Sequence, residues 1–330
     1  MSLAAIYDVT APAKLNLFLH VVGRRPDGYH LLQSVFVLID WCDTLHFERR
    51  SDGRLQRHDL GLALPADDLS LRAARALQQA SATSLGADLS VQKRVPWGAG
   101  LGGGSSDAAS TLLALNRLWG LNWSRQRLQQ LALPLGADVP FFVGGHNAFV
   151  AGIGEQLTPL PAGALPPQRF AVVKPTQAIA TAAIFGSPLL VRNTKAVILM
   201  SFLADAQQAA TLQDGARSES SSESLRSSSE SLRSSSESLR DSFWGFGRND
   251  LQPPAEASCP AVTQVAAWLA ARFGNSRMSG SGSAVFARMG AIDQPLGSGQ
   301  LDAVPAGLPD GWVGRMCLGL DRHPLVDWAS

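Results

Sequence analysis

A glycine-rich stretch from Pro96 to Ser106 carries the strongest chemical indication in the sequence. Five of the seven residues from Gly98 to Gly104 are glycines, which lets backbone N–H groups turn toward an anion with no Cβ in the way. A helix-like apolar stretch follows, and a helix N-terminus adds unpaired N–H donors and a favourable dipole. Ser105 and Ser106 could add hydroxyls toward phosphate or Mg²⁺. The alternative is a turn in which Ser106 or Asp107 caps the helix, but so many glycines favour a phosphate-binding loop.

Two common nucleotide-binding motifs do not explain this loop. Gly98, Gly100 and Gly103 spell GxGxxG, but a dinucleotide site also needs an acidic residue about 20 positions further on. The sequence has no Asp or Glu between Asp107 and Asp138. The P-loop pattern GxxxxGK[ST] and the HRD and DFG motifs of protein kinases are absent as well.

Asp138 is the first candidate for a catalytic side chain. It lies in GADVPFF, at the edge of an apolar run, where a carboxylate can accept a proton from a substrate hydroxyl. Taken alone, capping of a helix N-terminus by Asp138 is the better interpretation.

Lys14 and Asn16 are the second candidates, because they interrupt a strand-like run in APAKLNLFLHV. Residues two apart in a strand point to the same face. The chain has only four lysines, which suggests that Lys14 is retained for its compact ammonium. The alternative is an edge-strand lysine whose stem covers apolar surface while its charge reaches water.

The elements that must position these side chains can be read from hydrophobic periodicity and turn residues. RPDGYH, with Pro26, Asp27 and Gly28, predicts a turn. Because strands are grouped early in the chain, the pattern predicts an α+β fold rather than a doubly wound sheet. Strands are expected over residues 13–22, 34–39, 44–49, 89–95 and 284–288. Helices are expected over 68–79, where Asp68 marks the start of the helix, and over 108–119 and 260–273.

Composition excludes several classes of protein. The 330 residues are 45% apolar and 17% charged with a net charge of +1, so neither nucleic-acid binding nor a solvating role is expected. The three cysteines form no metal-binding pattern, and reduced thiols are expected. The sequence has no apolar run of about 18 residues and no N-terminal signal pattern, so we expect a cytoplasmic protein without a membrane partner.

Residues 220–240 are three identical copies of SSSESLR. One leucine per heptad among serines cannot bury enough surface to offset chain entropy. We therefore expect a disordered low-complexity insertion at about 217–241. A phosphorylated, partner-binding or scaffold tract is the alternative.

Several segments together resemble the GHMP kinase superfamily, and more closely its diphosphocytidyl-methylerythritol kinases. The matching segments are APAKLNLFLHV, RPDGYHLLQSVF, KRVPWGAGLGGGSSDAAS, LGADVPFFV, RNDL and SGSGSAVFA. The resemblance implies a two-lobed fold with the active site in the cleft between an ATP-binding lobe, residues 1–160, and a second lobe, residues 161–330.

The resemblance also implies roles for individual residues. Asp138 would be the catalytic base, and Lys14 would keep it ionised. Ala99 stands where the family often has glycine, which most positions with negative φ would tolerate. Phe185 and His30 could instead be a core residue and a turn residue. The implied ATP-binding residues are Pro96, Gly98, Ala99, Gly100, Leu101, Gly102, Gly103, Gly104, Ser105 and Ser106, and the implied substrate-binding residues are Asn16, Tyr29, His30, Lys93 and Phe185.

The implied reaction is Mg²⁺- and ATP-dependent phosphorylation of the 2-hydroxyl of a cytidine-diphosphate-linked methylerythritol, in the non-mevalonate route to isoprenoids. In this family Tyr29 and His30 would stack on and hydrogen-bond the cytosine. The chain is expected to be a monomer or homodimer. The alternatives are another GHMP kinase of the homoserine or mevalonate type, and a non-catalytic nucleotide-binding regulator of the same fold.

Overall fold

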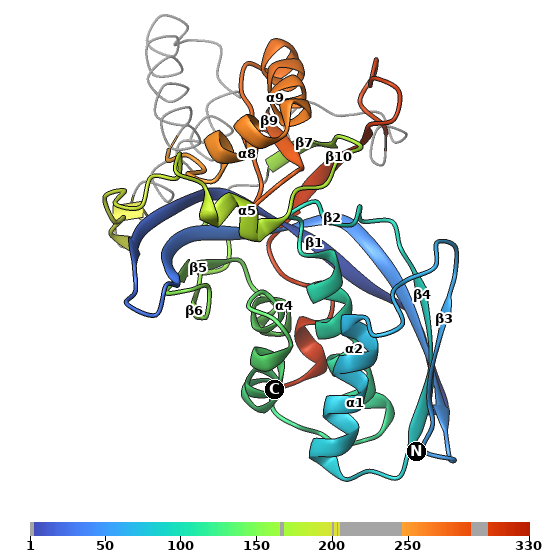
Figure 1. The fold of residues 1–330 in the computed structure, drawn as a ribbon. Helices are drawn as coiled ribbons and strands as arrows, with labels where there is room; N and C mark the ends of the chain where they lie inside the picture. The colour runs from blue at the N-terminus through green and yellow to red at the C-terminus, as the bar shows by residue number, and fades with distance from the viewer. Residues whose placement is uncertain (1–2, 166–167, 200, 203, 205–245, 292–302) are drawn as a thin grey trace, which may run out of the picture.

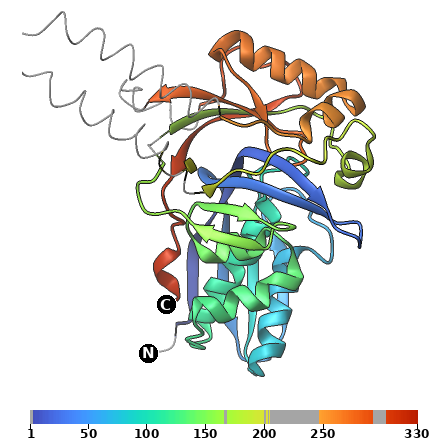
Figure 2. The same ribbon diagram turned by 90° about the vertical axis from the view of Figure 1, so that its left-hand side faces the viewer.

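The computed structural model describes residues 3–165, 168–199, 201–202, 204, 246–291 and 303–330. One sheet runs through it, with strand order β3-β4-β2-β10-β7-β9-β8, while β1 and β5 pair with β2 and β6 pairs with β5 (Figures 1 and 2). Most pairs are antiparallel, which confirms the predicted α+β class. Among the described residues, no helix combines the length and apolar character that crossing a membrane requires.

A long β-hairpin runs through the fold. Strands β1 (Ala5–Arg24) and β2 (His30–Arg50) are joined by the predicted turn. The two separate strands expected over 34–39 and 44–49 are one strand, because the pairing with β1 resumes on both sides of a bulge: Pro12 pairs with Cys42 and Ala13 with Ile39. A bulge bends the strand and re-aims side chains, and this one lies next to Lys14.

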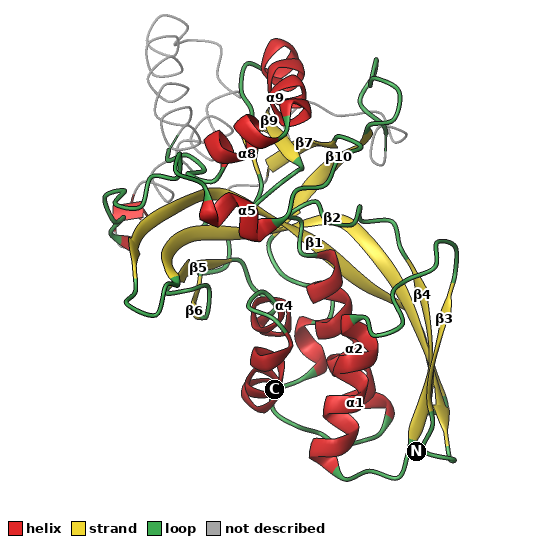
Figure 3. Ribbon diagram, in the orientation of Figure 1, coloured by secondary structure: helices red, strands yellow, loops and turns green. Residues whose placement is uncertain are grey.

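The first half of the chain packs helices on one side of this hairpin and its neighbours. Figures 1 and 3 show α1, α2 and α4 gathered there. As predicted, Asp68 caps α1, accepting hydrogen bonds from the N–H groups of Ser70 and Leu71. The elements are β3 (Leu55–Asp59), α1 (Leu69–Ser81), β4 (Gly86–Gln92), α2 (Gly103–Leu118), α3 (Arg125–Ala132), η1 (Leu133–Leu135), α4 (Val139–Gly144), β5 (Ala148–Ala151) and β6 (Gln156–Pro159).

The second half extends the same sheet and covers it with its own helices. Buried side chains of α8, α9, β7 and β9 form a separate apolar cluster in this half. The elements are β7 (Gln168–Lys174), α5 (Thr181–Gly186), α8 (Gln252–Ser258), α9 (Pro260–Phe273), β8 (Arg277–Met278), β9 (Val285–Ala291), β10 (Val313–Leu320) and η3 (Val326–Trp328).

The end of the chain returns to the first half. The backbone N–H of His323 donates to the carbonyl oxygen of Gly145 over 2.8 Å. The backbone N–H of Arg125 donates to the carbonyl oxygen of Ser330 over 2.7 Å. Leu325 is buried in the core that α1, α2 and α4 share. The end of the chain therefore packs against the first half, and the division of the chain at residue 160 stays a prediction. The insertion predicted at about 217–241 lies outside the described residues.

Candidate active site

The glycine-rich loop ends in an uncapped helix N-terminus. Helix α2 begins at Gly103, five residues before the predicted start at Ala108, and its N-cap is Gly102 with φ +72° and no capping side chain. The prediction that Ser106 or Asp107 caps the helix is therefore wrong. Because the first N–H groups of a helix have no intrahelical acceptor, these groups are available to an anion.

The glycines are also required by the packing around the loop. Gly98, Gly100 and Gly102 all have positive φ. A Cβ on Gly100 would overlap the carbonyl oxygen of Ser279, and one on Gly102 would lie 2.9 Å from Cζ of Phe142. Ala99 is buried and is not among the residues with positive φ, so its methyl group is accommodated as expected.

A second loop, SGSGS at residues 279–283, joins the two halves of the molecule at this point. Ser279 Oγ donates to the carbonyl oxygen of Gly100 over 3.2 Å and accepts a hydrogen bond from the N–H of Asn16 over 3.2 Å. The buried Asn249 amide donates to the carbonyl oxygens of Met278 and Gly280, over 2.7 and 2.8 Å. The RNDL segment therefore has a structural role, holding this loop, that sequence reasoning did not assign.

Lys14 lies under the glycine-rich loop and is only 3% exposed. Its Nζ donates to Oδ1 of Asn16 over 2.6 Å, lies 3.7 Å from Oδ2 of Asp138, and stands 4.5 Å above the ring of Phe36. The interpretation of Lys14 as a solvent-reaching lysine on an edge strand is therefore wrong. Burial lowers the pKa of Lys14, while the Asp138 carboxylate opposes this shift.

Asp138 stands at the N-cap position of α4, yet its side chain makes no capping hydrogen bond. Its φ and ψ of −85° and −15° are helical, whereas a capping side chain usually requires an extended backbone. Its carboxylate instead faces Lys14 and is 31% exposed. The capping interpretation is wrong, and the geometry leaves this carboxylate able to act as a base.

A cavity of about 730 Å³ opens beside this pair. It is lined by both glycine-rich loops, by the Lys14–Asp138 pair and by the turn that joins β1 to β2. The predicted site residues on its wall are Lys14, Asn16, Tyr29, His30, Gly100, Gly102, Asp138 and Phe185. Sequence reasoning missed Ser34, which also lines the cavity and accepts a hydrogen bond from Asn16 Nδ2 over 2.9 Å.

The far end of the cavity carries three ring side chains. Tyr29 is 60% exposed, and the rings of His30 and Phe185 stack with centroids 5.0 Å apart at an interplanar angle of 30°. His30 therefore packs against Phe185 and is not simply an unconstrained side chain of the turn. Phe185 lines the cavity and also packs against the core of the second half, so both interpretations of Phe185 hold. Burial lowers the pKa of His30, and the nearby Arg192 and Arg24 lower it further.

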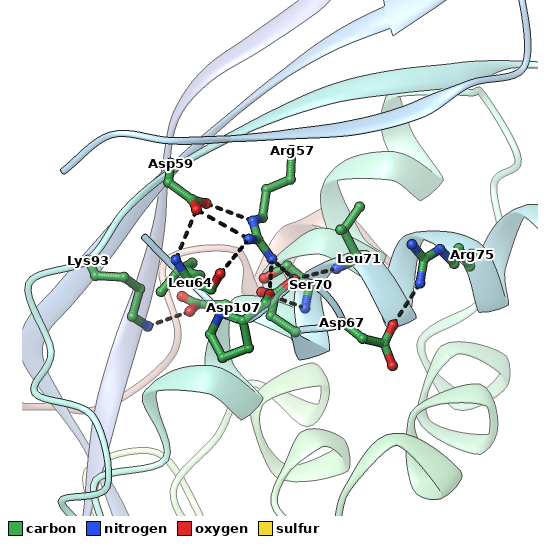
Figure 4. A network of polar contacts seen from close by, with 11 residues as sticks. Arg57, Asp59, Leu64, Asp67, Ser70, Leu71, Arg75, Lys93 and Asp107 are labelled. Atoms are coloured by element: carbon green, nitrogen blue, oxygen red, sulfur yellow. Dashed lines mark hydrogen bonds and ion pairs between the residues drawn. The ribbon is translucent and has the colours of Figure 1, made fainter. Parts of the chain in front are cut away.

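Lys93 does not lie on the cavity wall with the other predicted substrate-binding residues. Its ammonium donates to a carboxyl oxygen of Asp43 and to one of Asp107, the latter over 2.5 Å. Figure 4 shows the contact with Asp107. Asp43 also accepts hydrogen bonds from the N–H groups of Arg94 and Val95. This cluster therefore holds the chain that enters the glycine-rich loop against the first turns of α2, and the geometry does not place Lys93 beside a substrate.

An arginine network holds the start of the neighbouring helix α1. The guanidinium of Arg57 pairs with Asp59 over 2.7 Å and with the capping residue Asp68 over 2.6 Å (Figure 4). Because α1 packs against α2, this network supports α2 from one side.

A magnesium ion fits this site only as a companion of bound phosphates. No group of three or more His, Cys, Asp or Glu side chains that could hold a metal occurs in the described part of the chain. Mg²⁺ commonly keeps several waters and binds few protein ligands besides substrate phosphates. The hydroxyl of Ser106, buried in the first turns of α2, has no hydrogen-bond partner among the described residues.

Comparisons with known proteins show the family of the chain. Residues 68–146 match the family described as GHMP kinases N terminal domain, and residues 223–291 match GHMP kinases C terminal. The 4-diphosphocytidyl-2-C-methyl-D-erythritol kinase of Methylibium petroleiphilum is 60% identical over 330 residues, which is 100% of both chains.

Solved structures separate the near from the distant relatives. A crystal structure of 4-(cytidine 5'-diphospho)-2C-methyl-D-erythritol kinase is 32% identical with a TM-score of 0.66, and the match covers 94% of this chain and 98% of that one. Homoserine kinase from Cytophaga hutchinsonii is 16% identical with a TM-score of 0.58, covering 88% and 87%, and shares the fold alone. The protein is a kinase with the GHMP fold, and the chain belongs to the family of 4-diphosphocytidyl-2-C-methyl-D-erythritol kinases.

Proposed function

We propose that this kinase transfers the γ-phosphoryl group of ATP to the 2-hydroxyl of 4-diphosphocytidyl-2-C-methyl-D-erythritol, a step in isoprenoid precursor synthesis. One observation carries the proposal. A single cavity holds the Lys14–Asp138 pair and glycine-rich loops together with the aromatic group of Tyr29, His30 and Phe185. Such a cavity suits a substrate that has a reacting alcohol on one side and a pyrimidine base on the other.

Asp138 is the proposed base. Its carboxylate takes the proton of the substrate hydroxyl as that oxygen forms its bond to the γ-phosphorus of ATP, and the bond from phosphorus to ADP breaks. Lys14 stands beside the carboxylate, where its positive charge stabilises negative charge on the transferred group.

The phosphates of ATP are proposed to lie on the loop from Pro96 to Ser106. The free N–H groups at the start of α2 and its dipole favour negative charge there. Positioning and charge stabilisation account for most of the catalysis in phosphoryl transfer, so a rigid backbone cradle is the main requirement. When bound with ATP near Ser105 and Ser106, Mg²⁺ would neutralise phosphate charge.

The aromatic end of the cavity is proposed to bind cytosine. Tyr29 offers an exposed ring face, and Phe185 and His30 offer stacking surface and a polar ring edge. Homoserine and mevalonate have no base that would use these rings, so this end of the cavity favours the cytidine substrate over theirs. The presence of Lys14 and Asp138 in contact distance favours an active enzyme over a non-catalytic regulator.

A coupled assay of ADP release tests the proposal. Wild-type protein with Mg²⁺ and ATP is expected to release ADP with the cytidine substrate, and to show little release with homoserine or mevalonate. Asp138→Asn protein serves as the negative control for contaminating kinases. Equal or faster ADP release with homoserine or mevalonate would overturn the substrate assignment.

A further inference from the structure

Arg192 links the two rings at the base-binding end of the cavity. Its Nε donates to Nε2 of His30 over 3.1 Å. Its terminal nitrogens donate to the carbonyl oxygens of Phe185 and Ser187, over 3.1 and 2.9 Å, and to that of Leu190 over 3.0 Å. One guanidinium therefore fixes the segment that carries Phe185 and, through a separate bond, the ring of His30.

The bond to His30 determines where its proton lies. A guanidinium has only donors and stays protonated in proteins, so Nε2 of His30 must be the acceptor and carries no hydrogen. A neutral imidazole with an acceptor at Nε2 has its proton on Nδ1. Nδ1 of His30 has no hydrogen-bond partner among the described residues, and the side chain lines the cavity.

We propose that Arg192 is a positioning residue that fixes His30 as the neutral Nδ1–H tautomer, so that the ring presents one donor to an acceptor atom of the pyrimidine base. This inference rests on the proposed function for the identity of the ligand. Cytosine has such acceptors in its ring nitrogen and carbonyl oxygen. Without a guanidinium at Nε2, neutral histidine in water favours the opposite tautomer, in which Nδ1 is an acceptor.

The charges around His30 agree with a neutral ring. Both neighbouring cations, Arg192 and Arg24, lower the pKa of His30, as burial does. The titratable or charged side chains that share the cavity with it are Lys14, Arg24, Asp27, Tyr29 and Asp138.

A nuclear magnetic resonance experiment on the free enzyme tests the tautomer without any ligand. Long-range ¹H–¹⁵N correlation spectra of histidine-labelled protein distinguish Nδ1–H from Nε2–H rings, and His30→Gln identifies the His30 signals among the six histidines. The expected result at neutral pH is an Nδ1–H ring for His30 in the wild type. An Nε2–H ring, or a doubly protonated one, would overturn the proposal whether or not the enzyme uses the cytidine substrate.

Steady-state kinetics then test what the tautomer does. Arg192→Met is expected to raise KM for the cytidine substrate by about 3- to 10-fold, the loss of one hydrogen bond, with KM for ATP unchanged. Lowering the pH from about 8 to below the pKa of His30, which burial holds beneath its ordinary value of about 6.5, protonates both ring nitrogens and restores the Nδ1–H donor. The KM defect should therefore shrink at low pH.

The matched control is Arg75→Met, on α1. Arg75 pairs with the exposed Asp67 over 2.6 Å, and neither residue lines the cavity, so this variant should keep wild-type KM values. A KM defect of Arg192→Met that stays constant with pH would show that Arg192 only supports the fold around Phe185 and would overturn the proposal. A wild type that does not turn over the cytidine substrate would instead be a failure of the proposed function.

Discussion

The ammonium of Lys14 lies 3.7 Å from the carboxylate of Asp138 and 2.6 Å from the amide oxygen of Asn16. Lys14 comes from the middle of a long strand, and Asp138 comes from the start of a short helix. The bulge between Pro12 and Ala13, immediately before Lys14, and the loop before α4 bring them to one wall of the cavity. This pair is where the proposed chemistry can be tested most directly.

Replacing Asp138 by Asn is expected to lower kcat by about 10²- to 10⁴-fold, because the side chain keeps its shape and loses its capacity as a base. ATP affinity should stay close to the wild-type value, since the proposed phosphate-binding groups belong to the loop and α2. Turnover assays and calorimetric titration with ATP measure the two effects. A variant that kept most of the wild-type turnover would rule out Asp138 as the base.

The glycine-rich loop offers a matched pair of substitutions. Gly100→Ala is expected to destabilise the fold by about 1–3 kcal/mol, because φ is +73° and the new Cβ would meet the carbonyl oxygen of Ser279. Ala99→Gly, at the adjacent position with an ordinary backbone, should cost at most about 1 kcal/mol. Urea unfolding of both variants beside the wild type measures the difference. Equal destabilisation would show that the close approach to Ser279 carries no cost.

His30→Ala is expected to weaken binding of the cytidine substrate far more than binding of ATP. His30 stacks with Phe185 at the end of the cavity that we assign to the base, whereas the phosphates are assigned to the opposite loop. Isothermal titration with each ligand decides the point. Equal losses for the two ligands would mean that His30 has a structural role only.

Asp107 should make stability depend on pH. Burial raises its pKa to about 8, an effect that the Lys93 ammonium opposes and the Asp43 carboxylate reinforces. The folded state therefore binds this proton more tightly than the unfolded chain, whose carboxyl titrates near 3.8. The protonated carboxyl of Asp107 contributes its full stabilisation at pH values below about 3.8, the pKa in the unfolded chain. This contribution is lost as the pH rises through about 8, the pKa in the folded state.

Asp107→Asn tests this dependence, because the amide resembles the protonated carboxyl at every pH. Relative to the wild type, the variant should gain free energy of unfolding as the pH is raised from about 5 to about 8.5. Urea unfolding at several pH values gives the comparison, and the control is Asp67→Asn, an exposed carboxylate paired with Arg75. A difference between Asp107→Asn and the wild type that did not change with pH would contradict the raised pKa.

Local features of this molecule could be predicted from sequence because they depend on neighbouring residues. Asp68 caps α1 as expected, since an Asp followed by an apolar periodic stretch satisfies N–H groups two and three residues ahead. The turn after Arg25 follows from its Pro, Asp and Gly residues. The glycines of the loop likewise indicate positive φ and an anion site, and the α+β class follows from the grouping of strands.

Alternatives at single residues were decided only by contacts between distant segments. From sequence, capping was the better interpretation of Asp138, and only the position of Lys14 shows that its carboxylate faces the cavity. The helix after the loop starts at Gly103 because Gly102 adopts a left-handed conformation against Phe142, a neighbour that no local pattern reveals.

The sequence by itself determined the family, the glycine-rich loop and eight residues of the cavity wall, because these are recorded in contiguous motifs. Only the tertiary structure shows that Lys93 lies away from the cavity, in a cluster with Asp43 and Asp107. It also placed Arg192 on His30. Such pairings depend on burial and on the direction of side chains from separate elements, and a linear pattern of residue types contains neither.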